Sequence, residues 1–236
     1  MGAGQHIPGG NRALFAPAPG LRIILASGSP RRRELLAGWG MAFTILTAPE
    51  ETEPRPRPDE DAPAYALRAA RDKAARVRAL LAPDAAAASL IVAADTVVCL
   101  DGHILGKPRD EAHALRMLEA LAGQTHTVTS AVALHLPDAW PAPHEEDFTD
   151  TAAVTFAPWP REVLAAYART GEPADKAGAY AVQGRGAFLA EKLDGAWSTV
   201  VGLPLAPLAA LLLRCGLIFP ARRTQDSASP ACPGRR

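Results

Sequence analysis

One short segment, residues 173–184, carries an unusual combination of side chains that could bind a polar ligand. It places the charged pair Asp175 and Lys176 in a run of small residues, with glycines that permit close approach of the backbone. Gln183 adds an amide that can both donate and accept hydrogen bonds in one plane. We therefore expect this segment to form part of a wall that holds a polar ligand.

A second polar segment, residues 27–33, combines hydroxyls, a glycine and three arginines at a predicted strand-to-helix junction. Ser29 stands at the N-cap position, and a proline follows it at the first helical position. A helix N-terminus exposes unpaired N–H groups with partial positive charge, and Arg31 and Arg32 add full charge with forked donors. Together with the Ser27 hydroxyl, the segment suits phosphate oxygens. The alternative is a capped helix with solvated arginines, and the spacing of a Walker P-loop is absent.

Two further segments could supply acid–base chemistry and charge. Asp95 and Thr96 follow the apolar run 90–94, which is typical of a buried strand, and α/β sheets commonly place ligands where such strands end. The Asp95 carboxylate could bind a metal ion or orient water there, or it could simply form a local turn. Lys107 stands in the constrained tripeptide 106–108, where it could meet phosphate or remain solvated.

Candidate metal ligands lie in an acidic, proline-rich loop. Glu50 and Glu51 are adjacent there, and polyphosphate chemistry normally needs Mg²⁺ or Mn²⁺ to neutralise charge. We predict a divalent cation held by Glu51 and Asp95, with Glu50 as the alternative to Glu51. Lys73, on the helix predicted after this loop, is a further candidate for the catalytic site.

Alternating strand and helix patterns indicate how these residues are positioned. Strands are predicted at 22–26, 43–46, 90–94, 127–136 and 150–156. Helices are predicted at 30–40, 59–81, 111–121, 161–169 and 205–214. Asp-Gly pairs predict hairpin turns at 101–102 and 194–195. Mixed order plus hairpins predicts an α/β fold in which helices flank a mixed β-sheet.

Length, composition and charge bound the class of protein. A chain of 236 residues with 48% hydrophobic content can bury one sizeable core, so we expect a working domain at 21–220, a flexible tail at 1–20 and a disordered tail at 221–236. The formal net charge of +0 provides no field that would recruit nucleic acid or a membrane. Proline and arginine interrupt the apolar segment 203–219, so no membrane span is predicted. Three cysteines without a pattern indicate a reducing compartment, and a cytoplasmic protein is expected.

Taken together, the motifs resemble those of the Maf nucleoside triphosphate pyrophosphatases. The resemblance covers nearly all of the working domain and rests on separate motifs in the family's order and approximate spacing. These motifs are Leu25-Ala26-Ser27-Gly28-Ser29-Pro30-Arg31-Arg32, Ala94-Asp95-Thr96-Val97-Val98, Gly106-Lys107-Pro108, Asp175-Lys176-Ala177-Gly178-Ala179-Tyr180, Gln183-Gly184 and Val200-Val201-Gly202-Leu203-Pro204. The resemblance implies an elongated mixed β-sheet with two lobes around a central cleft, similar to the inosine triphosphate pyrophosphatases.

The reaction that the resemblance implies is hydrolysis of a nucleoside triphosphate between its α and β phosphates, which yields a monophosphate and pyrophosphate. Asp95 matches the family's proton acceptor. Because an unperturbed aspartate, with a pKa of about 3.9, is a weak base at neutral pH, we expect Asp95 to act on a metal-polarised water. Arg31, Lys107 and the helix start would hold the triphosphate, with Lys73 and Lys176 as further candidates.

Asp175 and Lys176, followed by Gln183, resemble the dTTP and UTP class of the family, in which the positions of Arg31, Thr96 and Gln183 are linked to substrate specificity. Thymine and uracil share an edge of carbonyl, N–H and carbonyl, so one amide could read both bases, canonical or modified. Two alternatives remain open, a nucleotide-binding regulator of cell division and septum formation, and a 7-methyl-GTP pyrophosphatase. A homodimer is compatible with the resemblance.

Overall fold

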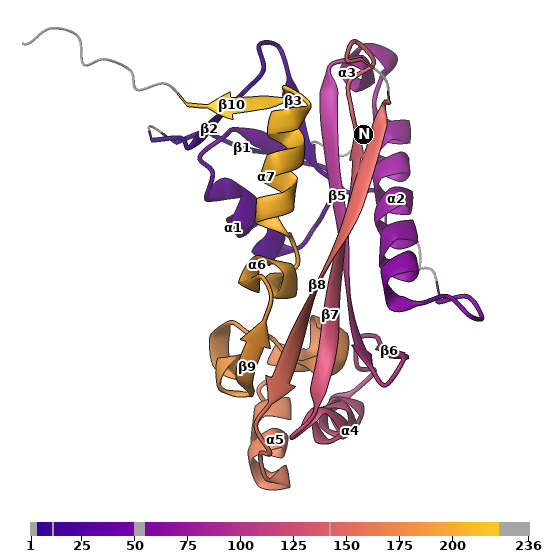
Figure 1. The fold of residues 1–236 in the computed structure, drawn as a ribbon, viewed down its shortest axis with the longest axis vertical. Coiled ribbons are helices and arrows are strands. Elements are labelled where there is room, and N and C mark those ends of the chain that lie inside the picture. Colours follow the sequence, from indigo (N-terminus) through magenta and orange to yellow (C-terminus); the bar gives the residue numbers. More distant parts are fainter. Residues whose placement is uncertain (1–3, 11, 50–54, 142, 222–236) are drawn as a thin grey trace, which may run out of the picture.

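The structure is a computed structural model that describes residues 4–10, 12–49, 55–141 and 143–221 of the chain. Its described strands form an eight-stranded mixed sheet and a separate two-stranded sheet (Figure 1). The main sheet has the order β1-β4-β3-β5-β7-β8-β9, with β6 paired to β5, and the small sheet pairs β2 with β10. The strands are β1 (Gln5–Ile7), β2 (Phe15–Pro17), β3 (Arg22–Leu25), β4 (Phe43–Ile45), β5 (Ser89–Leu100), β6 (His103–Leu105), β7 (Thr125–His135), β8 (Glu145–Phe156), β9 (Ala190–Asp194) and β10 (Ile218–Pro220).

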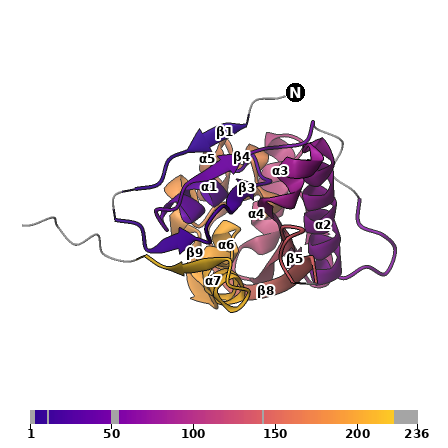
Figure 2. The ribbon, with the colours of Figure 1, turned by 90° about the horizontal axis from the view of Figure 1, so that it is seen from above.

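Helices cover both faces of this sheet, which confirms the predicted α/β class. The helices are α1 (Pro30–Ala37), α2 (Ala62–Leu80), α3 (Pro83–Ala87), α4 (Glu111–Leu121), α5 (Arg161–Ala168), α6 (Trp197–Val201) and α7 (Leu205–Arg214), with 3-10 turns η1 (Glu172–Asp175), η2 (Ala177–Ala179) and η3 (Gly184–Phe188). Seen from above, α2 lies at one side of the molecule and α1 at the other (Figure 2). Within the described part of the chain, no helix has both the length and the apolar character needed to cross a bilayer.

The sequence of α2 explains both its start and its position on the sheet. The Asp61 carboxylate accepts a hydrogen bond from the Ala64 N–H at 2.8 Å and so caps the first turn. Alanines at helical spacing, including Ala66, Ala70 and Ala74, are buried against β5 and β7. Because these side chains are small, the helix packs close to the sheet, and Lys73 of α2 reaches Asp95 on β5.

The strand that carries Asp95 is longer than the sequence predicts. Instead of ending at 94, β5 continues to Leu100, so Asp95 lies inside the strand opposite Ala131 of β7. The pairing of β5 with β7 is continuous from Ile91 to Cys99. This ladder of backbone hydrogen bonds outweighs the local tendency of an Asp-Thr pair to end a strand.

Two other predictions about chain organisation are wrong. The expected flexible tail at 1–20 contains β1 and β2, which pair antiparallel with β4 and β10, and Phe15 packs edge to face on Trp39. The hairpin expected at 194–195 is absent, because β9 ends at Asp194 and is followed by α6. Of the tail predicted at 221–236, residues 222–236 lie outside the described residues.

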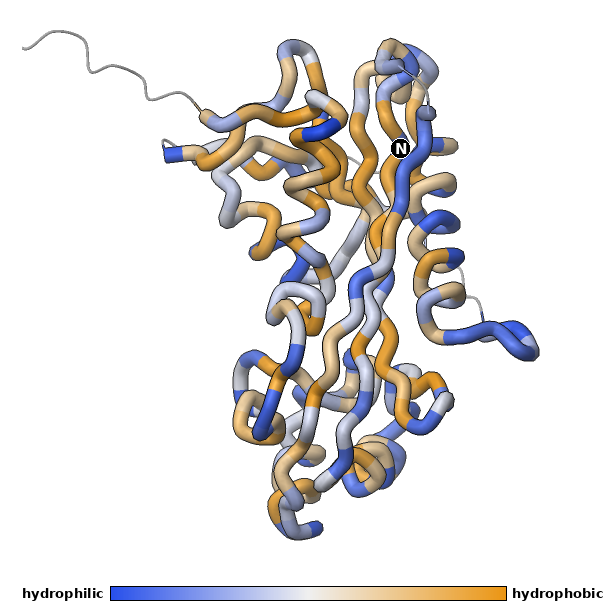
Figure 3. Tube along the Cα trace, in the orientation of Figure 1, coloured by the Kyte–Doolittle hydropathy of each residue, from blue (hydrophilic) through white to orange (hydrophobic). Residues whose placement is uncertain are grey.

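Two apolar cores share one face of the sheet and lie toward its opposite ends. The core under α1 and α7 includes Leu25 and Val92, whereas the core at α4 and α5 includes Val98 and Phe156. A third core joins α2 to the other face of the sheet. Hydrophilic residues interrupt the long strands between the two ends (Figure 3). The candidate site is centred on this polar interruption, which separates the two lobes.

Candidate active site

The centre of the site is the unpaired edge of β5 in the middle of the sheet. β3 pairs with β5 only at residues 89–92, and β6 pairs only at 98–100. Among the described strands, none pairs with this edge at 93–97. Because side chains alternate along a strand, Asp95 and Thr96 project to opposite faces of the sheet. A ligand at this edge can therefore meet both residues, one from each face.

Asp95 forms an ion pair with Lys73 on the face covered by α2. The Lys73 Nζ lies 2.5 Å from Oδ1 of Asp95, and the side chains are 31% and 11% exposed, respectively. The ammonium group stabilises negative charge on the carboxylate. The structure thus brings together Asp95, the predicted proton acceptor, and Lys73, one of the predicted lysines. The second carboxylate oxygen, Oδ2 of Asp95, takes no part in this bond.

The Arg32 guanidinium forms hydrogen bonds to other residues of the protein, whereas the sequence predicts that it binds substrate. Its Nε donates to the Gly202 carbonyl at 2.8 Å, Nη1 to Ser27 Oγ at 3.1 Å and Nη2 to Thr96 Oγ1 at 3.0 Å. Gly202 directly follows α6, Ser27 follows β3, and Thr96 lies on β5. Arg32 therefore joins three separate elements and positions Ser27 and Thr96.

The Thr96 hydroxyl begins a chain of hydrogen bonds across the sheet. Thr96 Oγ1 lies 2.8 Å from Ser130 Oγ, Ser130 donates to the Thr199 carbonyl at 2.7 Å, and the Thr199 hydroxyl donates to Asp150. Because the single hydroxyl proton of Ser130 is donated to the Thr199 carbonyl, the Thr96 hydroxyl must be the donor to Ser130. Arg32 donates to Thr96, so the Thr96 oxygen can only accept a hydrogen bond from a ligand.

The first turn of α1 lies near the segment that follows α5. Ser29 occupies the N-cap position, but its side chain does not cap the helix, and its N–H donates to Ser27 Oγ at 3.3 Å. Arg31 is half-buried, and its charge acts on Asp175 and Tyr167. The predicted phosphate-binding turn and the predicted ligand wall are therefore close enough to interact electrostatically.

The segment 173–184 folds as 3-10 turns against β5. Gly178 has φ +68, and a Cβ atom there would lie 3.0 Å from Val98 Cγ1, so the turn requires glycine. The Gly178 N–H donates to the Gly106 carbonyl at 3.1 Å. This bond places the tripeptide that carries the exposed Lys107 directly beside the segment.

Asp175 and Lys176 bind one another at the surface of this segment. The Lys176 Nζ donates to Asp175 Oδ1 and to the Glu172 carbonyl, both at 2.6 Å. Burial alone would raise the pKa of Asp175, but the hydrogen bond from Lys176 and the charges of Lys176 and Arg31 lower it overall. The pair is therefore a local ion pair that stabilises the turn and leaves an exposed carboxylate.

Gln183 follows a firmly anchored aromatic residue. The buried Tyr180 Oη lies 2.7 Å from Nε2 of His126 on β7, and both rings pack edge to face on Phe156. Burial lowers the pKa of His126 to about 4, so this imidazole is neutral at neutral pH. Gln183 is half-buried, and its side chain does not cap the turn after it, which leaves the amide available to a ligand.

Four residues that organise this site are not predicted from the sequence: Ser130, Thr199, Asp150 and Glu172. Isolated hydroxyl and acidic residues form no recognisable motif. Thr96, Ser130 and Asp150 stand in one cross-strand row, which is visible only once the register of β5, β7 and β8 is known. Glu172 carries a signal only through its position just before the segment 173–184.

The described residues supply one carboxylate for the predicted divalent cation. Glu51 and its alternative Glu50 lie outside the described residues. In the part that the structure describes, no three His, Cys, Asp or Glu residues are grouped to hold a metal ion. Mg²⁺ is commonly held by one or two carboxylates together with substrate phosphates. Asp95, whose Oδ2 lies outside the bond to Lys73, could supply one such carboxylate.

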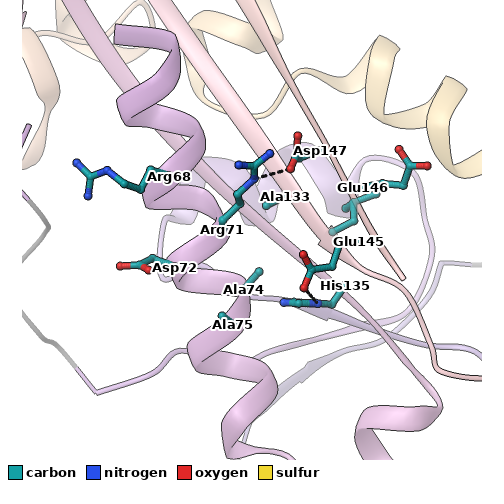
Figure 4. A pocket seen from close by; sticks show the side chains of 11 residues that line it. Arg68, Arg71, Asp72, Ala74, Ala75, Ala133, His135, Glu145, Glu146 and Asp147 are labelled. Carbon is teal, nitrogen blue, oxygen red and sulfur yellow. Dashed lines mark hydrogen bonds and ion pairs between the residues drawn. The ribbon is translucent and has the colours of Figure 1, made fainter. Parts of the chain in front are cut away.

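A surface pocket lies between α2 and the start of β8, and none of the predicted site residues lines it (Figure 4). Two contacts join its lining side chains: Arg71 Nε lies 2.6 Å from Asp147, and His135 Nδ1 lies 3.3 Å from Glu145. Burial lowers the pKa of His135, and the Glu145 charge opposes this effect. Because β9 pairs only with the far end of β8, charged side chains here discourage pairing with a second sheet.

The fold and the site define an α/β protein with a candidate phosphate site at the edge of its central strand. The chain belongs to the family described as Maf-like protein, whose model matches residues 22–215. This result confirms the predicted family resemblance.

Two relatives share much of the sequence. The chain is 49% identical over 196 residues to the dTTP/UTP pyrophosphatase of Nitratidesulfovibrio vulgaris, covering 83% of this chain and 89% of that protein. It is 47% identical over 201 residues to the dTTP/UTP pyrophosphatase of Methylococcus capsulatus, covering 85% and 94%. Among solved structures, the Ham1 protein of Staphylococcus aureus aligns over 58% of this chain and 72% of its own, with a TM-score of 0.36 and 14% identity. That structural similarity is too low to support an argument.

Proposed function

We propose that this protein is a nucleoside triphosphate pyrophosphatase that hydrolyses dTTP and UTP to the monophosphate and pyrophosphate. The observation that carries the proposal is the Asp95–Lys73 ion pair at the unpaired edge of β5, where the neighbouring Thr96 is bonded to Arg32 of α1. The relatives named dTTP/UTP pyrophosphatase support the choice of reaction and substrate.

Asp95 is the proton acceptor in this proposal. A water molecule at the edge of β5 attacks the α-phosphorus, its proton passes to the free oxygen of Asp95, and the bond to the pyrophosphate oxygen breaks. Lys73 holds the carboxylate in position and keeps positive charge beside the developing phosphate charge. Mg²⁺ or Mn²⁺ bound by Asp95, Glu51 and the phosphates would neutralise charge and acidify the attacking water.

The triphosphate would be held by charge from several elements. Ser29 and Arg31 lie in the first turn of α1, and Lys107 lies beside the turn of Gly178. Arg32 contributes indirectly, since its guanidinium positions Ser27 and Thr96. Helix N–H groups and arginine side chains are suited to phosphate oxygens because both offer preorganised donors.

Base recognition would come from Gln183 and Thr96. The Gln183 amide can donate to a carbonyl of thymine or uracil and accept from the ring N–H. Thr96 can accept but not donate, so it is the alternative acceptor for this single ring N–H. Cytosine presents an acceptor where thymine has this N–H, and a buried mismatch leaves polar groups unpaired.

A pyrophosphate-release assay with Mg²⁺ or Mn²⁺ tests the proposal across dTTP, UTP, CTP and 7-methyl-GTP. Release from dTTP and UTP well above CTP is the expected result, and modified pyrimidine triphosphates should be tested in parallel. Tight binding without release from any nucleotide would favour a nucleotide-binding regulator of septum formation. Selective release from 7-methyl-GTP would reject the pyrimidine assignment.

We also propose that the protein is cytoplasmic and forms a homodimer. Support for the compartment is the small number of cysteines, of which Cys99 and Cys215 are free thiols. Fractionation of cells and light scattering of the purified protein test these two points. Recovery with exported proteins, or a monomeric mass at micromolar concentration, would contradict them.

A further inference from the structure

The segment that carries Gln183 needs a specific anchor, because it has few backbone hydrogen bonds of its own. Residues 172–188 contain three short 3-10 turns, among them η3 immediately after Gln183. The Tyr180–His126 contact secures the segment before Gln183. The carboxylate of Glu172, at the start of the segment, secures it after Gln183.

Glu172 accepts three hydrogen bonds that join its own segment to α5 and to η3. Its Oε2 accepts from the Arg185 N–H at 3.0 Å, and its Oε1 accepts from the Gly186 N–H and the Tyr167 hydroxyl, each at 3.0 Å. Two of these donors are the backbone of η3, and the third lies on α5. The carboxylate thus holds η3 against the end of α5.

The glycines of η3 are shaped around this carboxylate. Gly184 has φ +68, and a Cβ atom there would lie 3.0 Å from Oε2 of Glu172. A Cβ atom on Gly186 would lie 2.5 Å from Oη of Tyr167. Gly186 therefore has no room for a side chain, whereas a side chain at Gly184 would strain the backbone and press on Glu172.

The bonds to Glu172 are of the strong, charge-assisted kind. Burial alone would raise the pKa of Glu172, but the hydrogen bonds from Arg185, Gly186 and Tyr167, with the charge of Lys176, lower it overall. The ionised form is therefore the one that the turn requires. Hydrogen bonds to an ionised acceptor are about twice as strong as neutral ones.

We propose that Glu172 is a positioning residue for base specificity, which fixes η3 and thereby the direction of the Gln183 amide. This inference rests on the proposed function, because it deepens the account of how that site selects pyrimidine bases. Glu172 touches neither phosphate nor base in this role. It acts through the backbone of residues 184–186.

The variant Glu172→Gln tests the proposal with almost no change in size. The amide oxygen can keep the two bonds made by Oε1, but the NH₂ group then faces the Arg185 N–H, donor against donor. We expect kcat/KM for dTTP to fall about tenfold, mainly through KM, and the preference for dTTP over CTP to fall by a similar factor. Glu119→Gln, which removes a surface partner of Arg161 in the same lobe, is the matched control and should change neither value.

A double-mutant cycle separates positioning from general support of the fold. In a Gln183→Ala background, Glu172→Gln should produce little further loss of base preference, because the amide it positions is gone. Equal losses for dTTP and CTP, or losses that add fully to those of Gln183→Ala, would overturn the proposal. If Glu172→Gln does not fold, Tyr167→Phe removes one of the three donors and should show the same non-additivity in a weaker form.

Failure of this inference is distinguishable from failure of the proposed function. If the unaltered protein releases no pyrophosphate from dTTP, the proposed function is wrong. If it does so and the Glu172→Gln variant keeps the full preference for dTTP over CTP, only the positioning role is wrong.

Discussion

The two halves of the candidate site are built in different ways. The half around Asp95 and Thr96 stands on β5, which is paired continuously with β7 from Ile91 to Cys99. The half at residues 172–188 consists of 3-10 turns that side chains hold by bonds to the backbone. A backbone ladder therefore sets the geometry of the first half, whereas a few side-chain bonds set that of the second.

This difference separates the two tasks of the proposed enzyme. Chemistry needs atoms held within a fraction of an ångström, and regular elements provide that rigidity. In the proposed enzyme, the choice among bases depends on the Gln183 amide, which lies beside a turn held by only a few side-chain bonds. We therefore expect changes at Asp95 to lower turnover of every substrate. Changes in 172–188, or at the proposed base contact Thr96, should alter the choice of base.

The largest effect is expected at Asp95. Asp95→Asn removes the proton acceptor and should lower kcat for dTTP and UTP by about 10²–10⁴-fold. Nucleotide binding, measured by calorimetry, should persist because the bonds of Arg32 to Ser27 and Thr96 remain. Asp84→Asn, at an exposed position in α3, is the control. Near-normal turnover of Asp95→Asn would show that another group accepts the proton.

Arg32→Lys should have the next largest effect. A lysine cannot reproduce a fork that reaches Gly202, Ser27 and Thr96 together, so both hydroxyls lose their orientation. We expect kcat/KM for dTTP and UTP to fall together by about tenfold to a hundredfold. Arg214→Lys at the end of α7 provides the comparison. A fall in kcat/KM confined to either dTTP or UTP would contradict this expectation.

A smaller and more selective effect is expected at Gln183. Gln183→Glu removes the amide donor and adds negative charge near the nucleotide, so kcat/KM for dTTP should fall about tenfold or more. Activity on CTP should fall less, and the ratio of the two is the measurement that matters. Gln124→Glu adds the same charge at an exposed position. Unchanged dTTP hydrolysis would place base recognition elsewhere.

The smallest effect concerns stability in acid. The pKa of Glu172 in the folded protein lies below its usual value of 4.5, so its contribution to stability is present above pH 4.5 and is lost as pH falls below it. The free energy of unfolding, measured with denaturant, should decline more steeply below pH 4.5 in the unaltered protein than in Glu172→Gln. Parallel declines would indicate that the turn contributes little to global stability.

Local patterns predict most of the regular elements. Apolar runs identify β3 and much of β5, and the alanine-rich periodicity identifies α2, because these signals lie within a few residues of one another. The segment 15–17 carries no such signal. It becomes strand β2 only by pairing with β10, about two hundred residues away. The predicted turn at 194–195 fails for a related reason, since β9 pairs with β8 and the chain after Asp194 continues into α6.

The motifs predict the members of the site better than their roles. Asp95, Lys73, Arg31 and Gln183 are chemically able to act on a nucleotide, and the residue types alone reveal this. Glu51, which the sequence also nominates, lies outside the described residues and stays a prediction. Arg32 has the same charge and forked donors as Arg31, so its inward bonds cannot be foreseen from its type.

The sequence by itself determined the chemistry available to this protein, its family and the local elements that carry the motifs. Only the tertiary structure decided which groups meet. It paired Lys73 with Asp95, turned Arg32 toward Thr96 and placed Glu172 under the turn of Gln183. The physical reason is that side-chain type and short-range periodicity are written along the chain, whereas hydrogen-bond partners depend on strand register and on contacts between distant segments.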